Sequence, residues 1–257
     1  MKHGNKPHYE YNRIADRKRI DFIADVLKKS FPDNARVLDV GCGNGVISRH
    51  LGRMGYEVLG IDVSDKTIEM ARAIEPLPNV TFMKKSAEEL VASGEKYDIV
   101  ICSEVLEHLN EPGKLLEVLH STIADNGKLI ITVPNGKGPR EMLVTRPVLH
   151  IRNKRKGLWK LITKVKSSLG YSGTTKQSAA DNLDHIQFFS KKDLEKLSAS
   201  YNFKIIKFGK ANFIEDVFPF SFFSKKIPLL QKMDCKVADM LPTQLTGGFF
   251  SVWEKAN

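Results

Sequence analysis

The sequence predicts an α/β fold in which a doubly wound, mostly parallel sheet is covered by helices on both faces. Apolar runs typical of strands alternate with helix-like segments along most of the chain, an order that favours parallel sheets. The run from Arg36 to Leu51, RVLDVGCGNGVISRHL, joins a β-branched segment to a helical pattern through three alternate glycines. Asp62 then ends the next apolar run, EVLGID. This order of strand, glycine turn, helix, strand and acid is typical of a nucleotide-binding unit.

Seven strands and the helices between them follow from the hydrophobic pattern. The first helix is expected over Tyr11 to Ser30, because apolar residues recur there at helical spacing among charges. Strands are expected at Arg36 to Val40, Glu57 to Ile61, Val80 to Lys84, Tyr97 to Ser103, Lys128 to Val133, Phe203 to Phe208 and Phe249 to Trp253. Helices are expected at Gly45 to Met54, Thr67 to Ala73 (N-cap Ser64), Pro112 to Ala124, and after Ser190, which has capping-box spacing to Asp193. No element is assigned to the Phe- and Pro-rich stretch from Asn212 to Pro242.

Composition indicates a water-soluble enzyme. The chain has 257 residues, of which 42% are hydrophobic and 27% charged, which suits one domain with an appendage. No apolar run approaches the roughly 20 residues that span a bilayer, and the start lacks the apolar core of a signal peptide, so we expect a cytoplasmic protein. Cys42, Cys102 and Cys235 are isolated, a pattern that predicts neither a disulfide framework nor a structural zinc site.

The glycine spacing indicates which nucleoside is bound. A dinucleotide turn reads G-x-G-x-x-G, whereas the third glycine here, Gly45, follows Gly41 and Gly43 one residue too early. Asp39 precedes the first glycine by two residues, where a carboxylate would repel a phosphate and favour a cation. The turn therefore predicts a positively charged nucleoside without phosphate.

At these residues the chain resembles motif I of the class I S-adenosylmethionine-dependent methyltransferases, an acid followed by three alternating glycines. The resemblance covers Arg36 to Val133 well and the C-terminal strands loosely. It implies S-adenosyl-L-methionine as cofactor and a Rossmann-like sheet whose last strand is antiparallel. The cofactor residues that it implies are Asp39, Gly41, Cys42, Gly43, Gly45, Asp62, Val63, Ser86, Ala87, Glu88 and Ser103. Two alternatives stay open: Val63 as an ordinary core residue, and Glu88 as an exposed carboxylate in the first turn of a helix.

The fourth strand is followed by candidate catalytic residues. It ends in CSEVLEHL, which resembles the Glu-His-Leu of quinone-precursor, small-molecule and sugar O-methyltransferases. His108, next to Glu107, suits removal of a proton from an acceptor hydroxyl at neutral pH, and His185 is the second candidate. The alternative for each histidine is a structural hydrogen bond. Tyr9 and Tyr11 are candidates for an aromatic lid over the cofactor.

Motifs that the sequence lacks limit the target atom of the acceptor. The residues after the fourth strand do not form the Asn-Pro-Pro-Tyr tetrapeptide of amino-group methylation, and no cysteine follows a proline, so oxygen is the expected target atom. The acid pairs that hold magnesium in catechol-type relatives are not recognisable, so no residue is assigned to a metal. We expect O-methylation of a small molecule, a lipid-linked intermediate or a glycan. The alternatives are an RNA methyltransferase and a non-catalytic cofactor-binding protein with the same fold.

The basic excess lies in one segment. Residues 137–180 contain eleven Lys or Arg and one acid, a net charge of +10 that equals the net charge of the whole chain. In KGLWKLITKVKSSLG, an apolar stripe at helical spacing is bordered by lysines and Trp159, which is typical of a helix in an anionic membrane surface. Such a helix would place the protein peripherally on the inner face of the membrane, with nucleic acid as the less favoured partner. The alternatives are a stripe that packs on the enzyme itself, or a solvated loop.

The predicted organisation is therefore a helical cap at 1–35, a cofactor-binding domain at 36–136 and 185–257, and a basic, partly helical insertion at 137–184. The insertion would serve as acceptor lid or membrane contact. No oligomeric state is predicted.

Overall fold

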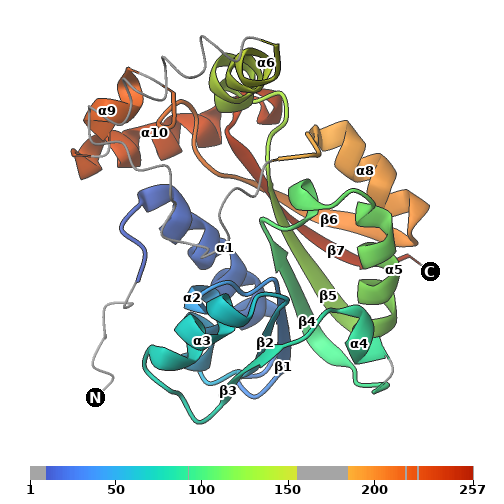
Figure 1. The fold of residues 1–257 in the computed structure, drawn as a ribbon. Coiled ribbons are helices and arrows are strands. Elements are labelled where there is room, and N and C mark those ends of the chain that lie inside the picture. Colours follow the sequence, from blue (N-terminus) through green and yellow to red (C-terminus); the bar gives the residue numbers. More distant parts are fainter. Residues whose placement is uncertain (1–9, 92, 155–184, 218, 225, 257) are drawn as a thin grey trace.

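A computed structural model of the chain describes residues 10–91, 93–154, 185–217, 219–224 and 226–256 (Figure 1). Its seven strands form one sheet in the order β3-β2-β1-β4-β5-β7-β6. They are β1 (Arg36–Val40), β2 (Glu57–Asp62), β3 (Val80–Lys84), β4 (Tyr97–Ser103), β5 (Ile123–Pro134), β6 (Phe203–Lys210) and β7 (Gly248–Lys255). Strand β7 pairs antiparallel with both β5 and β6, and the other pairs are parallel. The predicted fold class is confirmed.

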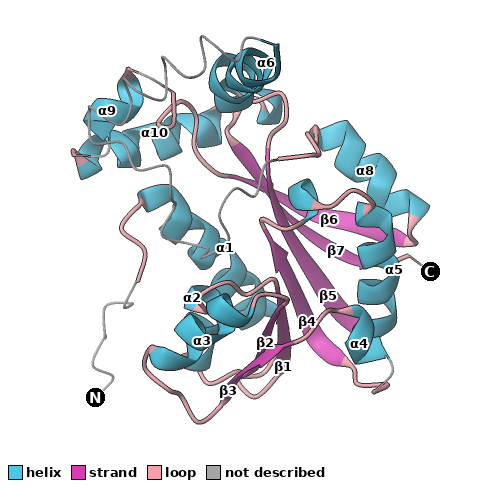
Figure 2. Cartoon of the chain, viewed as in Figure 1, coloured by secondary structure: helices cyan, strands magenta, loops and turns pink. Residues whose placement is uncertain are grey.

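Helices cover both faces of the sheet (Figure 2). On one face, α1 (Ile14–Ser30) and α2 (Val46–Gly52) bury their apolar residues against β1, β2 and β4, and α3 (Asp65–Ala73) packs beside them. On the other face, α4 (Glu88–Val91), α5 (Pro112–Thr122) and α8 (Lys191–Ser200) share a core with Leu38, Val100 and Trp253. The buried residues of helix α1 therefore belong to the core on this face of the sheet.

Helix ends follow local hydrogen bonding. Ser64 caps α3 by accepting a bond from the Thr67 amide at 3.3 Å, and Ser190 and Asp193 form the predicted capping box of α8. Helix α1 starts at Ile14 rather than Tyr11, because Arg13 is still extended. Helix α5 ends at Thr122, two residues earlier than predicted, because β5 already begins at Ile123.

Further helices lie at the carboxyl end of the parallel strands. They are the π-helical turn η2 (Glu141–Thr145), α6 (Arg146–Lys154), α9 (Phe220–Ser224) and α10 (Pro228–Met240); the 3-10 turns η1 (Leu106–His108) and η3 (Thr243–Leu245) complete the elements described. The stretch from Asn212 to Pro242, for which no element was predicted, thus contains the two helices α9 and α10. Helix α10 starts at a proline, which suits the first turn of a helix. The predicted amphipathic helix of the insertion and Tyr9 lie outside the described residues. Within the described part, no helix is long and apolar enough to cross a membrane.

Candidate functional site

The glycine turn and Asp62, the acid that ends β2, lie in contact. Gly41, Gly43 and Gly45 all have positive φ angles, of 68°, 56° and 78°, which favour glycine because other L-residues are strained there. The Gly43 amide donates to Asp62 Oδ2 at 3.2 Å, and the Ser64 amide donates to Asp62 Oδ1 at 2.9 Å. The turn is therefore held against the carboxylate that is expected to bind ribose hydroxyls.

Asp39 lies below the turn. Its side chain is buried, and its Oδ2 accepts a hydrogen bond from the Ser48 hydroxyl at 2.6 Å. Burial raises the pKa of Asp39 to about 6. Through this bond to Ser48, Asp39 is connected to helix α2, which follows the glycine turn. Cys42 is buried as well, and burial raises the pKa of its thiol.

The residues expected around the adenine differ in exposure. Val63 is 70% exposed, so it is not a core residue and its side chain is free to pack on a ligand. Ala87 is buried in the core beside Leu90, which leaves only its backbone for contact. Glu88 is exposed in the first turn of α4, and the Ser86 amide donates to Glu89 Oε2 at 2.6 Å.

Ser103, at the end of β4, belongs to a polar group that includes a residue the sequence analysis missed. Its hydroxyl lies 2.8 Å from the Thr132 hydroxyl, which donates to Glu104 Oε1 at 2.9 Å. Glu104 has a φ of 58°, the left-handed region, and its Oε1 lies 3.4 Å from the buried guanidinium of Arg19. Burial raises the pKa of the neighbouring Tyr11 to about 12. A non-glycine residue held at positive φ often marks a functional site, but no sequence pattern shows φ.

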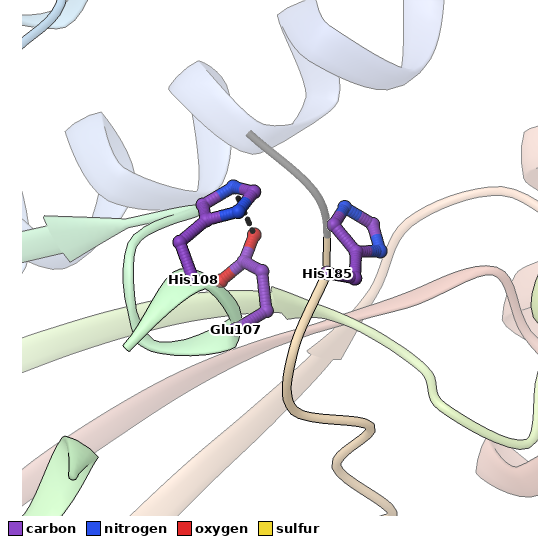
Figure 3. Close-up of side chains that lie close together, drawn as sticks. All are labelled: Glu107, His108 and His185. Carbon is purple, nitrogen blue, oxygen red and sulfur yellow. Dashed lines mark ion pairs between the residues drawn. The ribbon is translucent and has the colours of Figure 1, made fainter. Parts of the chain in front are cut away.

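The three predicted catalytic residues come together (Figure 3). His108 Nε2 lies 3.8 Å from Glu107 Oε1, and the rings of His108 and His185 are 5.3 Å apart. Backbone bonds join the two segments, because the amides of Ile186 and Gln187 both donate to the Glu107 carbonyl, at 2.8 and 2.9 Å. The loop before α8 is thereby fixed to the turn after β4.

Glu141 is a fourth member of this group. Its Oε1 lies 3.4 Å from His185 Nδ1, and its side chain is 1% exposed. Sequence reasoning counted Glu141 only as the lone acid of the basic segment, although an isolated acid among eleven basic residues was itself a signal. The contact holds the Nδ1 side of the His185 ring.

The buried carboxyl groups of this cluster lack hydrogen-bond partners. Both side-chain oxygens of Glu107 and of Glu141 are buried without a hydrogen bond among the described residues. Burial, with Glu104 adding to it, holds the pKa of Glu107 well above its usual range, whereas His185 lowers that of Glu141. The buried Glu107 carboxyl group therefore requires a proton, a cation or a polar ligand, whereas Glu141 already has the His185 ring beside it.

One arrangement of donors suits a metal ion, although the sequence analysis assigned none. The ligand atoms of Glu107, His108 and His185 all lie within 4.8 Å of one another. One carboxylate and two imidazoles are donors that zinc and similar metals accept. The cluster can therefore act as a proton acceptor or hold a cation, at the carboxyl edge of the sheet.

Comparison with known proteins gives the family. The sequence model of a methyltransferase domain family matches residues 11–207. The ubiquinone biosynthesis O-methyltransferase of Azorhizobium caulinodans is 34% identical over an alignment of 128 residues that covers 46% of this chain and 51% of that protein. The protein of the same name from Aeromonas salmonicida is 31% identical over 142 residues, 54% of this chain and 57% of that protein. The chain spans about half the length of these curated relatives.

Solved structures share the fold at low sequence identity. Magnesium protoporphyrin IX methyltransferase from Synechocystis PCC 6803, solved with S-adenosylhomocysteine, has a TM-score of 0.53 at 20% identity, over 94% of this chain and 84% of that one. The 4+2 cyclase SpnF has a TM-score of 0.58 at 16% identity, over 98% of this chain and 86% of that one. The same fold thus carries more than one chemistry. Since the family model spans most of the sequence, the chain belongs to this methyltransferase domain family.

Proposed function

We propose that the protein transfers a methyl group from S-adenosylmethionine to a hydroxyl group of a small acceptor molecule. The observation that carries the proposal is the meeting of two sites at one edge of the sheet. The glycine turn follows β1 and Asp62 ends β2, while Glu107 and His108 follow β4, the strand next to β1, where the segment before α8 brings His185 to them. Ligands of doubly wound sheets bind at this carboxyl edge. The names of the relatives favour oxygen as the target atom.

The cofactor side of the proposal rests on Asp62 and Val63. The Asp62 carboxylate is positioned by two backbone amides and is the natural acceptor for ribose hydroxyls. The exposed Val63 side chain beside it offers an apolar surface to the adenine. Calorimetry should detect binding of S-adenosylmethionine and S-adenosylhomocysteine but not of nicotinamide dinucleotides. Gly43→Val should abolish that binding, because a side chain would fill the space of the ligand.

The acceptor side needs little covalent chemistry from the protein. The acceptor oxygen attacks the methyl carbon, the bond from that carbon to sulfur breaks, and the sulfonium becomes the thioether of S-adenosylhomocysteine. The hydroxyl proton passes to a base, and most of the acceleration comes from alignment of oxygen, methyl and sulfur. His185, oriented by Glu141, and His108, beside Glu107, are the two candidate bases.

Alanine substitution separates the two candidates. Replacement of the true base should lower turnover by about 10² to 10⁴ fold while cofactor affinity is unchanged. His120→Ala, a histidine on α5 beside Phe203, is the matched control. If neither variant is slower than the control, alignment alone carries the reaction.

The acceptor class is the finer part of the proposal. We favour a small amphipathic, lipid-linked or glycan acceptor, brought to the site by contact of the basic segment 137–180 with an anionic membrane. Incubating membrane, RNA and small-molecule fractions with radiolabelled S-adenosylmethionine tests this. Label in RNA would favour the alternative of an RNA methyltransferase, and cofactor binding without transfer to any fraction would favour a binding protein.

A further inference from the structure

Helix α10 is oriented opposite to an ordinary surface helix. The side chains that it buries are Gln231, Asp234, Cys235 and Ala238. The side chains that it exposes include Leu229, Met233, Val237 and Met240, which are 64%, 54%, 41% and 85% exposed. Their spacing of four, four and three residues places them on one face of the helix. The apolar face thus points to solvent while polar groups point inward.

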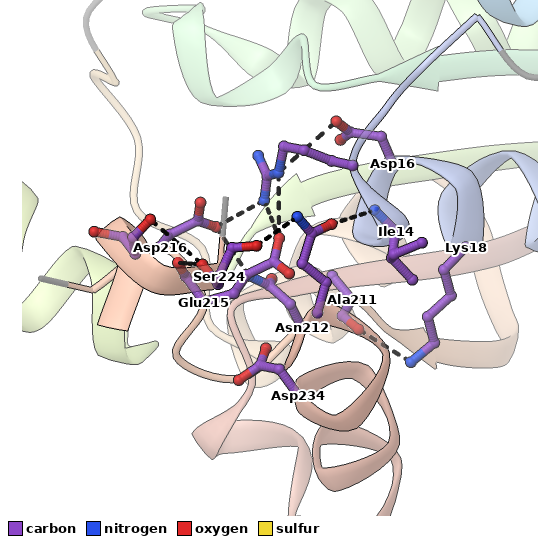
Figure 4. Close-up of polar contacts among 12 residues, drawn as sticks. Ile14, Asp16, Lys18, Ala211, Asn212, Glu215, Asp216, Ser224 and Asp234 are labelled. Carbon is purple, nitrogen blue, oxygen red and sulfur yellow. Dashed lines mark hydrogen bonds and ion pairs between the residues drawn. The ribbon is translucent and has the colours of Figure 1, made fainter. Parts of the chain in front are cut away.

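Internal hydrogen bonds fix this orientation (Figure 4). The Asp234 carboxylate accepts from the amides of Phe213 and Ile214, at 2.8 and 2.9 Å. Gln231 accepts from the Ile14 amide and donates to the Ser224 carbonyl, both at 2.9 Å. Rotation of α10 to bury its apolar face would leave these buried groups unpaired, which is costly. The outward apolar face is therefore built into the fold.

The neighbouring helix α9 and the turn after it extend this surface. Phe222, Phe223 and Ile227 are 49%, 53% and 44% exposed, and α9 packs beside α10 at the margin of the molecule (Figure 1). We call the seven side chains the outer apolar face: Phe222, Phe223, Ile227, Leu229, Met233, Val237 and Met240. Exposed apolar side chains gathered on two neighbouring helices in this way indicate an interaction site.

Positive charge accompanies the outer apolar face. Lys226 lies with its Nζ 4.6 Å from the Phe222 ring centre, and Lys232 and Lys236 are one turn apart on α10. Among the described residues, no ion pair joins Lys226 or Lys232 to a carboxylate, whereas Lys236 lines a groove shared with Asp21 and Asp239. The acids of α10 do not offset this charge, since Asp234 is buried and Asp239 pairs with Lys18 at 2.7 Å.

The positive charge beside the outer apolar face distinguishes two possible binding partners, a second copy of the chain and a lipid surface. In a two-fold dimer, the same face of two copies would meet, and the lysines would be brought together without acids to pair them. An anionic lipid surface instead accepts the apolar side chains among its acyl chains and the lysines among its headgroups. We propose that the outer apolar face of α9 and α10 docks the protein on an anionic bilayer.

Strand register places this face near the acceptor site. Gly248, the first residue of β7, pairs with Pro134 at the end of β5, and Lys210 at the end of β6 pairs with Phe249. The chain between β6 and β7 therefore emerges at the carboxyl edge of the parallel strands, where the proposed acceptor binds. The docking inference does not depend on methyl transfer; only its consequence, a membrane-held amphipathic acceptor, rests on the proposed function.

Vesicle sedimentation of the full chain tests the docking. The vesicles contain equal parts of phosphatidylglycerol and phosphatidylcholine, with pure phosphatidylcholine for comparison. The test variant combines Leu229→Gln, Met233→Gln and Met240→Gln. The matched control combines Met70→Gln, Ile74→Gln and Met83→Gln, three exposed apolar side chains around α3 and β3. Far-UV circular dichroism and cofactor calorimetry report on the fold of both variants.

We expect the wild type and the control to bind anionic vesicles, and the test variant to bind roughly a hundredfold more weakly, because three apolar side chains no longer leave water. Lys226→Gln, Lys232→Gln and Lys236→Gln together should reduce the salt dependence of binding. Equal binding by the test and control variants would overturn the proposal. Self-association of the wild type that the test variant abolishes, without vesicle binding, would assign the face to a second copy.

A further variant distinguishes membrane binding by this surface from membrane binding by the basic segment 137–180. Lys154→Gln, Arg155→Gln, Lys156→Gln and Lys160→Gln alter the membrane contact proposed above and leave α10 intact. If this variant binds as the wild type does and the α10 variant does not, docking by α10 holds while the basic-segment contact fails. The reverse result overturns docking by α10. Absence of cofactor binding would refute the proposed function without affecting either outcome.

Discussion

Substitution of Gly45 by alanine tests whether the glycine turn is required by space as well as by backbone conformation. Gly45 has a φ of 78°, and a Cβ atom there would lie 2.3 Å from Phe82 Cζ and 2.9 Å from Arg49 Nη1. The left-handed conformation costs an alanine about 1–2 kcal/mol, and crowding of a packed site adds about 1–3 kcal/mol. The expected loss of unfolding free energy is therefore about 2–5 kcal/mol, from the sum of these two costs.

Gly94 provides the matched control. Its φ is 67°, close to that of Gly45, but a Cβ atom there would meet nothing within 4 Å. Gly94→Ala should therefore cost only the backbone strain of about 1–2 kcal/mol, without change in cofactor affinity. Urea unfolding measures the free energies, and calorimetry with S-adenosylhomocysteine measures affinity, which Gly45→Ala should weaken because Phe82 and the turn must move. Equal destabilisation by the two variants would refute the steric part of the reasoning.

Three further outcomes follow from buried charges. Burial raises the pKa of Asp39 to about 6 from 3.8, so the folded state retains a proton that the unfolded state releases, and the contribution of Asp39 to stability should fall as pH rises from about 4 to about 6. The stability of Asp39→Asn relative to the wild type should therefore rise over that range, by up to about 3 kcal/mol, in urea titrations. Glu10→Gln should destabilise the fold by about 3 kcal/mol in the same assay, because the fully buried Arg49 loses its carboxylate partner. Glu141→Gln should lower turnover roughly 10- to 100-fold and alter the pH–rate profile through His185, with cofactor affinity unchanged; an unaltered profile would mean that Glu141 does not position that ring.

The centre of the sheet could be predicted because its strands, such as β1 and β4, are buried on both faces. Strand β4 is an almost continuous apolar run, and β1 and β3 were predicted with their observed ends. Fully buried parallel strands have this pattern, and it needs no knowledge of the rest of the chain. The starts of α3 and α8 could also be predicted from the local sequence, since Ser64 and Ser190 accept hydrogen bonds from the amides of residues three positions later.

The cofactor-binding residues could be predicted because they lie close together in the sequence, whereas the residues of the acceptor site could be predicted only in part. The glycine turn and Asp62 lie within some twenty residues of one another in a fixed order that physical constraints impose. Glu141 reaches His185 across more than forty residues, and Glu104 meets Arg19 across more than eighty. No spacing rule relates such pairs, because the fold alone brings them together.

Helix α10 shows why periodicity is an incomplete guide to burial. Leu229, Met233 and Met240 recur at helical spacing, and that pattern alone would have turned them toward the core. The opposite face of α10 is buried instead, because two backbone amides before α9, those of Phe213 and Ile214, donate hydrogen bonds to the Asp234 carboxylate. An unpaired buried amide or carboxylate costs about 1–3 kcal/mol or more, comparable to the gain from burying one large apolar side chain. Where hydrogen bonding decides the orientation of a helix in this way, its exposed apolar face needs a separate explanation, and a lipid surface accounts for both the apolar side chains and the lysines beside them.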